Sequence, residues 1–398
     1  MNNRPHLILA PGKEKALLRR HPWIFSGAVK NLQGSCSSGD LVDVYSSSGQ
    51  WLAVGHFQND SIICKVLSFE TDVIDRLFWH DKFVKAINYR ESLGIIDADG
   101  NMSSDSNAIR LVHGEGDFLP GLIADYYNGI VVMQAHSMGM YRNFDLFAEL
   151  WRELLPVRAV FNKSAATLPS SDKVVDGYIG SDGPMEWEMV EYENKMFVNF
   201  YEGQKTGFFI DQRDNRHKLQ LLARNKRVLN CFGYTGGFSL AALRGGASFV
   251  QTVDISKKAI SMAQRNVQIN FGDDAPHQGV VADVTQFLDC PNDLPFDIVI
   301  LDPPAFAKNH RNLQQGLKGY RHINQKALEK MPSGSLLFTF SCSQAVSRDD
   351  FQTMIFTAAA NANRNVRIVQ WLSQSADHPV SIYHPEGEYL KGLLLQVE

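Results

Sequence analysis

Cysteine is scarce in this chain, and long apolar runs are missing altogether. The 398 residues include five cysteines, at positions 36, 64, 231, 290 and 342. No two of them form a C-x-x-C pair and no Cys or His spacing resembles a zinc site, so we expect neither a disulfide framework nor a bound metal. No apolar run approaches the roughly 18 to 20 residues of a membrane span. The N-terminal "LILA" is too short for the apolar core of a signal peptide, so we expect a cytoplasmic protein without a membrane partner.

The chain also lacks an overall basic charge. Its net charge is -4, which argues against a protein that coats nucleic acid indiscriminately. The first 30 residues are different, because they hold six basic side chains against one acidic side chain. That local charge of +5 leaves -9 on the rest of the chain. A basic face on an acidic body favours selective docking on a polyanion, with a solvated helix face as the alternative.

Three regions follow one another along the chain, which is too long for one ordinary core. Residues 1–72 contain short alternating runs such as "DLVDVYS" and "WLAVGHF", which predict a small β-barrel module. Residues 73–188 mix strand and helix patterns and predict a central β/α domain. Residues 189–398 alternate near-continuous apolar strands with amphipathic helices, which predicts a doubly wound α/β domain around a parallel sheet.

A glycine-rich turn follows the first strand of the third region, in "NCFGYTGGFSLAAL". Gly233, Gly236 and Gly237 would let a ligand approach the backbone where a helix begins. The spacing is G-x-x-G-G and not G-x-G-x-x-G, so a pyrophosphate site is not the first choice. Tight packing of the turn is the structural alternative.

Carboxylates end the next strands of the same sheet. Asp254 ends the second strand, about 20 residues after the glycine turn, where a carboxylate can accept both hydroxyls of a ribose. Ser256 is free to cap the following helix instead. Asp283 follows the third strand and can either accept from an adenine amino group or cap a helix. Acidic groups without neighbouring cations suit S-adenosylmethionine, a cationic cofactor, better than NAD or ATP.

Two further motifs end the fourth and fifth strands. In "ILDPPAF", Asp302 is followed by Pro303 and Pro304, whose fixed extended backbone can line a slot for a flat ring or simply end the strand. In "SLLFTFSCSQ", Cys342 lies at the same carboxyl edge between two small serines. We interpret Cys342 as a nucleophile. Cys231 and Cys290 we interpret as small buried apolar residues, the usual role of a free cysteine.

Taken together, these motifs resemble a known family. "NCFGYTGGF", "VDISKKA", "DPPAF", "TFSCS" and "KTGFFIDQRDNR" are similar to those of the bacterial 23S ribosomal RNA cytosine-C5 methyltransferases of the RlmI type. "LLRRHPWIFSGAV" resembles the N-terminal PUA domain of that family, and "HPEGEYLKG" resembles its C-terminal strands. The resemblance implies an RNA-binding PUA domain, a central domain and a Rossmann-like class I domain that binds S-adenosylmethionine.

By motif, the resemblance assigns Asp254 to the ribose, Asp283 to the adenine and Asp302 to the target base, with Cys342 and Asp302 as catalytic residues. The cofactor residues that it implies are Phe209, Gln212, Phe232, Gly233, Tyr234, Thr235, Gly236, Asp254, Ile255, Asp283, Val284, Asp302 and Pro303. The RNA-binding residues are Lys13, Arg19, Arg20 and Arg213. The sequence departs from the family pattern at Phe118, where glycine is usual, and at Ala305, where many RNA cytosine-C5 methyltransferases carry a second cysteine.

The sequence therefore predicts an enzyme that methylates C5 of a cytosine in 23S ribosomal RNA through a covalent cysteine adduct. Its expected partner is 23S ribosomal RNA or a large-subunit precursor, and a homodimer is left open. Two alternatives remain at this point. One is a ribosomal RNA guanine methyltransferase, which needs no nucleophile because a ring nitrogen attacks directly. The other is a catalytically silent RNA-binding factor of ribosome assembly.

Overall fold

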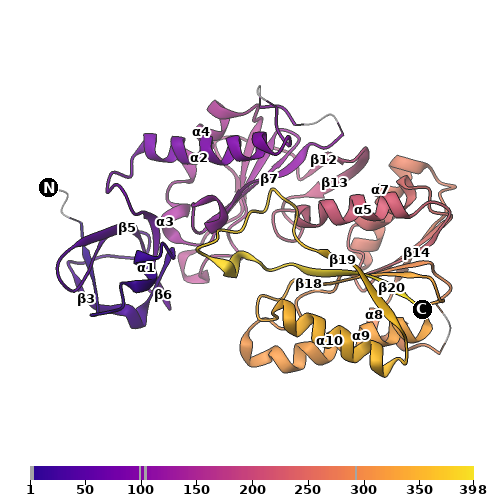
Figure 1. Ribbon diagram of the computed structural model, residues 1–398. Helices are drawn as coiled ribbons and strands as arrows, with labels where there is room; N and C mark the ends of the chain where they lie inside the picture. The colour runs from indigo at the N-terminus through magenta and orange to yellow at the C-terminus, as the bar shows by residue number, and fades with distance from the viewer. Residues whose placement is uncertain (1–3, 98–99, 103–104, 292–293) are drawn as a thin grey trace. The chain divides into compact units, whose positions relative to one another are not determined.

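The computed structural model describes residues 4–97, 100–102, 105–291 and 294–398 (Figure 1). They divide into two compact units. The first unit comprises Met1–Met189, Val198–Ile210 and Ala376–Gly387, and the second comprises Val190–Phe197, Asp211–Ser375 and Glu388–Glu398. The units are interleaved, because two segments of the predicted third domain belong to the first unit. The predicted domain boundaries after residues 72 and 188 stay predictions, and residues 1–3 of the first domain lie outside the described residues.

The first unit begins with a six-stranded sheet. Its hydrogen-bonded order is β2 (Trp23–Phe25), β6 (Ile62–Ser68), β5 (Trp51–Phe57), β4 (Leu41–Tyr45), β1 (His6–Leu9) and β3 (Val29–Gln33). Strands β1 and β4 are parallel, and the other neighbours are antiparallel. Alternate residues such as Leu7, Leu9, Val42 and Val44 form its buried core. A single helical turn, α1 (Lys15–Leu18), lies between β1 and β2.

A second sheet of the first unit has the order β11 (Gly177–Tyr178), β10 (Ala159–Asn162), β9 (Ile130–Ala135), β8 (Leu122–Tyr127) and β7 (Ala108–His113). The same unit also contains the helices α2 (Arg76–Ser92), the short α3 (Met138–Tyr141) and α4 (Phe144–Leu154). Phe83 of α2 stacks on Trp151 of α4 with ring centroids 4.2 Å apart. The hairpin β12 (Glu186–Glu191) and β13 (Asn194–Asn199) is divided between the units, since Val190–Phe197 belongs to the second and the rest of it to the first.

Buried hydrogen bonds to Asp377 hold the segment Ala376–Gly387 in the first unit. Arg90 pairs with Asp117, and its guanidinium also donates to the carbonyl of Asp377 at 2.7 Å. The carboxylate of Asp377 accepts from the backbone N–H of Arg110 at 2.9 Å. A buried charge must be paired and hydrogen-bonded to avoid a large desolvation cost. These contacts explain why a segment near the C-terminal end of the chain packs with residues far earlier in the sequence.

The second unit is built on a seven-stranded sheet, and it confirms the predicted doubly wound fold. The order is β16 (His277–Val281), β15 (Phe249–Asp254), β14 (Arg227–Cys231), β17 (Ile298–Leu301), β18 (Leu336–Ser341), β20 (Lys391–Val397) and β19 (Val366–Leu372). The first five are mutually parallel, and β20 is antiparallel to both of its neighbours.

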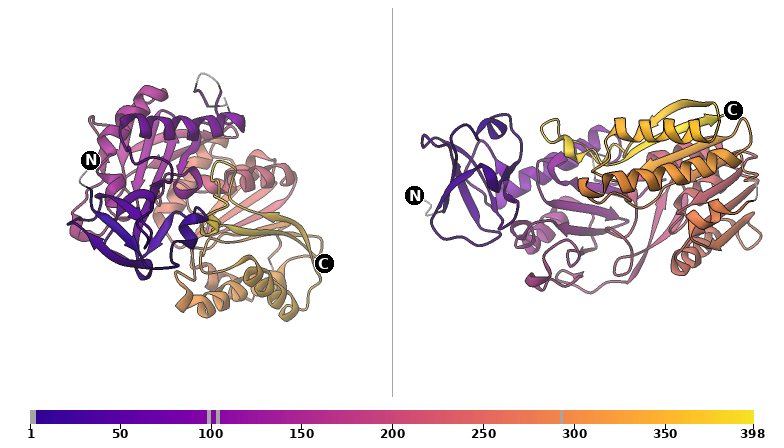
Figure 2. Two further views of the ribbon diagram at one scale, coloured as in Figure 1. Left: turned by 60° about the vertical axis from the view of Figure 1, so that its left-hand side comes forward. Right: turned by 90° about the horizontal axis from the view of Figure 1, so that it is seen from below.

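Helices cover both faces of this sheet, as the continuous apolar strands require. Figure 1 shows α5 (Arg213–Leu222) and α7 (Lys257–Phe271) on one side, and α8 (Val284–Asp289), α9 (Leu313–Lys330) and α10 (Arg348–Asn361) on the other. The further views agree that α9 and α10 lie side by side (Figure 2). A core of buried residues from α8, α9, α10 and the central strands fills the space between these helices and the sheet. Helix α6 (Gly237–Arg244) follows β14 after the glycine turn.

No helix within the described ranges combines the length and the apolar character needed to cross a membrane. The same ranges contain no cluster of three or more His, Cys, Asp or Glu side chains placed to hold a metal ion.

Candidate active site

The carboxyl ends of five parallel strands meet at one edge of the sheet, here called the carboxyl edge. The strand order reverses between β14 and β17, and open α/β sheets bind ligands at such a switch point. The glycine turn follows β14, and Asp254 is the last residue of β15. Asp302 and Cys342 directly follow β17 and β18. The structure therefore brings these predicted site residues to one edge.

The turn after β14 has an unusual backbone. Phe232 and Tyr234 have φ values of 58° and 46°, and Gly236 has a φ of 86°. The backbone N–H of Tyr234 donates to Asp254 Oδ2 at 3.0 Å, which links this turn to the end of β15. A Cβ at Gly236 would lie 2.9 Å from Cβ of Ala263, and one at Gly233 would clash with the methyl group of Thr252. Tight packing therefore requires glycine here, and it also keeps the turn open to a ligand.

The two carboxylates after β15 and β16 differ in what they do locally. Asp254 accepts from the N–H of Ser256 at 2.8 Å as well as from Tyr234, while the Ser256 hydroxyl caps α7 by accepting from Ala259 N. This confirms that Ser256 is the cap. Asp283 itself caps α8, accepting from Gln286 N at 3.0 Å, and its contact with an adenine stays a prediction.

Buried polar atoms near this edge test whether a cofactor fits. Thr235 Oγ1 and Asn230 Oδ1 are buried without a hydrogen-bond partner among the described residues, and so is Gln212 Nε2. The Gln212 Oε1 atom accepts from Asn215 Nδ2 at 2.6 Å. An unpaired buried donor or acceptor costs about 1 to 3 kcal/mol. Unpaired buried polar atoms, close to the glycine turn and to the carboxylates of the carboxyl edge, fit a polar and cationic nucleoside cofactor that would bond to them.

Cys342 lies where two loops are joined. Its Sγ is 3.9 Å from the carbonyl oxygen of Pro303, and the side chain is half-buried. The next residue, Ser343, accepts from Ala307 N at 3.2 Å through its hydroxyl. The same hydroxyl lies 2.8 Å from the phenol oxygen of Tyr320, which is fully buried on α9. The loop after β17 and the loop after β18 are thus fixed relative to each other around the thiol.

A lysine also belongs to this cluster. The antiparallel register of β18 and β20 places Lys391 opposite Ser341, the residue before Cys342. Lys391 Nζ donates to the carbonyl oxygens of Ser343 at 2.7 Å and Tyr389 at 2.8 Å. Burial lowers the pKa of Lys391 to about 8, and the negative charge of Cys342 acts in the opposite direction. A buried cation therefore lies close enough to Cys342 for their charges to interact.

The remaining predicted residues are placed as follows. Asp302 and Phe232 are half-buried, Ile255 is exposed and Val284 is buried. Phe209 belongs to the first unit, where Lys205 Nζ lies 4.4 Å from its ring centroid, so its contact with a cofactor stays a prediction. Arg213 is buried, and its Nε lies 3.6 Å from Asp214 Oδ1. In this position Arg213 offers almost no exposed surface to RNA, so its role in RNA binding stays a prediction.

Of the two cysteines interpreted as buried apolar residues, one is buried and the other is not. Cys231 is fully buried in β14, as expected of a small apolar residue. The same interpretation is wrong for Cys290, which is exposed. The N-terminal candidates Lys13, Arg19 and Arg20 are all exposed, and Arg20 lies 3.3 Å from Glu70. Their contact with RNA stays a prediction.

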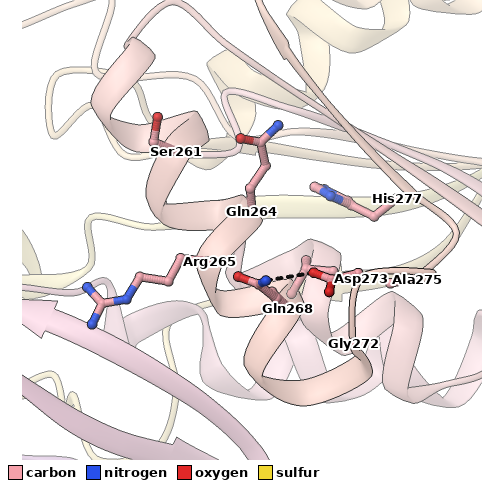
Figure 3. A pocket seen from close by; sticks show the side chains of 9 residues that line it. Ser261, Gln264, Arg265, Gln268, Gly272, Asp273, Ala275 and His277 are labelled. Carbon is pink, nitrogen blue, oxygen red and sulfur yellow. Dashed lines mark hydrogen bonds between the residues drawn. The ribbon is translucent and has the colours of Figure 1, made fainter.

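A pocket of about 390 Å³ lies elsewhere, between the C-terminal half of α7 and the start of β16 (Figure 3). Its lining includes Gln264, Arg265, Gln268 and His277, and Gln268 donates to Asp273 at 2.6 Å. Parallel β16 begins here, so this is the edge of the sheet opposite to the one that bears Asp254 and Cys342. None of the predicted site residues lines it.

Comparisons with known proteins bear on this arrangement. A family profile described as S-adenosylmethionine-dependent methyltransferase matches residues 170–387, and one described as PUA-like domain matches residues 7–69. The chain is 38% identical to the ribosomal RNA large subunit methyltransferase I of Escherichia coli (strain SMS-3-5 / SECEC), over 98% of this chain and 99% of that protein. It is 37% identical to the protein of the same name from Shigella flexneri serotype 5b, with the same coverage.

Solved structures agree on the fold. A crystal structure of SMU.776, described as a methyltransferase in complex with SAH, has a TM-score of 0.84 at 23% identity and covers 98% of this chain and 99% of that one. A SAM-dependent methyltransferase from Streptococcus mutans has a TM-score of 0.83 at 22% identity, with the same coverage. With a full-length relative at 38% identity and a family profile that spans more than half of its residues, the chain belongs to the ribosomal RNA large subunit methyltransferase I family of S-adenosylmethionine-dependent methyltransferases.

Proposed function

We propose that this methyltransferase transfers a methyl group from S-adenosylmethionine to C5 of a cytosine in 23S ribosomal RNA, with Cys342 as the nucleophile. The observation that carries the proposal is the position of Cys342, half-buried at the same edge as Asp254 and Asp302, with the ammonium of Lys391 in β20 bonded to the carbonyl of Ser343 in the Cys342 loop. The relatives that carry the name of a large-subunit ribosomal RNA methyltransferase support the substrate class. We expect the protein to act in the cytoplasm, on 23S ribosomal RNA or a large-subunit precursor, and we leave the homodimer open.

S-adenosylmethionine supplies an electrophilic methyl group when it is bound. The residues proposed to hold it lie mainly on the glycine turn and the ends of β15 and β16. Asp254 would accept the ribose hydroxyls while the N–H groups of Tyr234 and Ser256 keep its carboxylate oriented. Asp283, fixed as the cap of α8, would face the adenine with its remaining acceptor capacity. The carboxylates also favour a cationic ligand over a phosphorylated one.

The nucleophile is needed because cytosine C5 belongs to an electron-poor ring. Attack by the Cys342 thiolate forms a bond between Sγ and C6 and makes C5 enamine-like, so that C5 can take the methyl group. A base then removes the C5 proton, the C5–C6 double bond re-forms, and Cys342 leaves as a thiolate. Asp302 is proposed to hold the ring by hydrogen bonding at N3 or the exocyclic amine. The guanine alternative assigns no role to this thiol.

Lys391 supplies the positive charge that a reactive thiolate requires. Two of its three ammonium protons are donated to Ser343 and Tyr389, and these contacts hold Nζ beside the thiol loop. Because the charge interaction between Cys342 and Lys391 is mutual, a protonated lysine favours the ionised thiol. Tyr320 has a different role, since burial raises the pKa of its phenol and keeps it neutral at pH 7. It positions the loop through Ser343.

The first prediction concerns cofactor binding. Asp254→Ala should weaken S-adenosylmethionine binding by one to two orders of magnitude, because hydrogen bonds to a charged group contribute about 1.5 to 3 kcal/mol. Isothermal titration calorimetry measures this change. Asp273→Ala is the matched control, since Asp273 lies at the opposite edge of the sheet and should bind the cofactor as the wild type does. Equal affinities for all three proteins would remove Asp254 from the cofactor site.

The second prediction concerns the nucleophile. Cys342→Ala should abolish methyl transfer while leaving cofactor affinity and the midpoint of thermal unfolding nearly unchanged. RNA with 5-fluorocytosine at the target should form a covalent adduct with the wild type, because fluorine cannot leave as a proton does. Denaturing gel electrophoresis detects the adduct, and Cys342→Ala should show none. Cys290→Ala, which removes an exposed thiol, should keep both activities. Methylation by Cys342→Ala at a comparable rate would instead favour the guanine alternative.

The third prediction concerns pH. A protonated Lys391 favours the ionised Cys342 thiol, so the methylation rate of the wild type should rise with pH as the thiol ionises while Lys391 is still charged, below its pKa of about 8. Lys391→Gln should shift this rise to higher pH and slow the reaction at pH 7 by at least about tenfold. The pH dependence of Cys342 alkylation by iodoacetamide gives the same information without RNA. Lys326→Gln, which changes a half-buried lysine on α9 that pairs with Glu329, is the control. A Lys391→Gln profile identical to the wild type would exclude the lysine from thiol activation.

The fourth prediction concerns RNA docking. Replacing Arg19 and Arg20 together with alanine should weaken RNA binding and flatten its dependence on salt by roughly one to two units of log K per log salt, because phosphate contacts release counterions. Filter binding over a series of KCl concentrations measures the slope. The double variant Lys226→Ala, Arg367→Ala removes the same charge from exposed sites of the second unit and should keep the slope. A slope unchanged in the Arg19 and Arg20 variant would place the phosphate contacts elsewhere.

A further inference from the structure

Phe118 has a backbone conformation that a phenylalanine rarely adopts. It ends the short 3-10 helix Gly114–Asp117 with φ 58° and ψ 32°, in the left-handed region that glycine enters without steric cost. Its side chain is 57% exposed, so most of the ring buries nothing in the first unit. Strained backbone at a bulky residue persists where the surroundings hold it, and it is most common at functional sites. Packing of the fold does not explain why an aromatic ring stands here.

The surroundings of Phe118 are cationic and aromatic. Lys82 of α2 donates from Nζ to the carbonyl oxygen of Phe118 at 3.2 Å. The same ammonium lies 6.0 Å from the centroid of the Phe118 ring and 5.4 Å from that of Phe78. Burial lowers the pKa of Lys82 to about 8, and the charge of Lys85, which is exposed one turn further along α2, acts in the same direction. We call Phe78, Lys82, Lys85 and Phe118 the Phe118 surface.

This surface continues toward the basic N-terminal segment. Glu70 interacts electrostatically with Lys82 and also lies 3.3 Å from the guanidinium of Arg20. Arg20 in turn lies 5.9 Å from the ring centroid of Phe69. All of these residues belong to the first unit. The exposed ring is therefore part of a surface on which cations alternate with aromatic side chains, the combination that binds single-stranded nucleic acid.

We propose that Phe118 is a stacking platform for an unpaired RNA base, with Lys82 and Lys85 beside it to accept the adjoining phosphates. The proposal rests on the proposed function, which makes RNA the substrate. A protein partner is less well matched, because one isolated ring among lysines offers little continuous apolar area, whereas every base has a face that stacks. The hydrogen bond from Lys82 to the carbonyl of Phe118 holds the backbone that presents the ring, so the backbone needs little ordering on binding.

The test separates binding from folding. Phe118→Gly removes the ring and relieves the left-handed backbone, so this variant should unfold at a higher temperature than the wild type and bind RNA roughly five- to a hundredfold more weakly. Phe118→Tyr should keep the wild-type affinity within about twofold. Leu77→Ala removes an apolar side chain of α2 that is 65% exposed, and it should leave RNA affinity unchanged. The probe is deproteinised 23S ribosomal RNA, measured by filter binding at one salt concentration.

Photocrosslinking gives a second readout. RNA transcribed with 5-iodouridine should crosslink to the peptide that contains Phe118, because the photochemistry favours a stacked aromatic ring. Wild-type affinity in Phe118→Gly, or loss of stability without loss of affinity, would overturn the proposal. Failure of the proposed function looks different, since the wild type itself would then neither bind nor methylate the RNA. A crosslink at Phe118 with a weakened Phe118→Gly variant supports the platform.

Discussion

The hydroxyl of Ser343 holds the proposed active site together. It bonds to the buried phenol of Tyr320 and accepts from Ala307 N, so the loop after β17 and the loop after β18 share one anchor in the core. The carbonyl of the same residue accepts from Lys391. A thiol that must attack one ring atom requires positioning to fractions of an ångström, and side chains fixed by buried hydrogen bonds supply it. Under the proposed function, the distance between the base slot at Asp302 and Cys342 is set by this one residue.

Much of this arrangement could be predicted because its signals are local. Continuous apolar strands separated by amphipathic helices specify a parallel sheet, and a parallel sheet brings the ends of its strands to one edge. The positions of Asp254, Asp302 and Cys342 followed from that rule alone. Helix caps were also readable, since Ser256 precedes α7 as a serine with the right spacing. Asp283 was undecided because a capping aspartate and a ligand-binding aspartate look identical in sequence.

Three features could not be predicted, because each depends on contacts between distant parts of the chain. They are the place of Lys391 beside Cys342, the exposure of Cys290 and the interleaving of the two units. Lys391 lies near Cys342 only because β20 pairs antiparallel with β18. The residues of a single strand do not specify which strand will pair with it. The segment Ala376–Gly387 joins the first unit through buried hydrogen bonds of Asp377 with Arg90 and with the backbone of Arg110, residues more than 200 positions away. The one local signal for Lys391 was its place in "HPEGEYLKG", a motif that suggested the fold but not the chemistry.

In the proposed reaction, the cofactor and the RNA backbone need binding surfaces of opposite charge. Three carboxylates at the carboxyl edge attract a cationic cofactor, and the same charges repel phosphate groups within the screening distance of about 8 Å at physiological salt. The RNA backbone must therefore be neutralised by other residues, and the sequence concentrates its basic excess in the first 30 positions. An uncharged base carries no such penalty. A cytosine turned out of its stack can reach Cys342 while its phosphates stay outside the acidic edge, so the same electrostatics that favours the cofactor also favours a flipped base over an intact duplex.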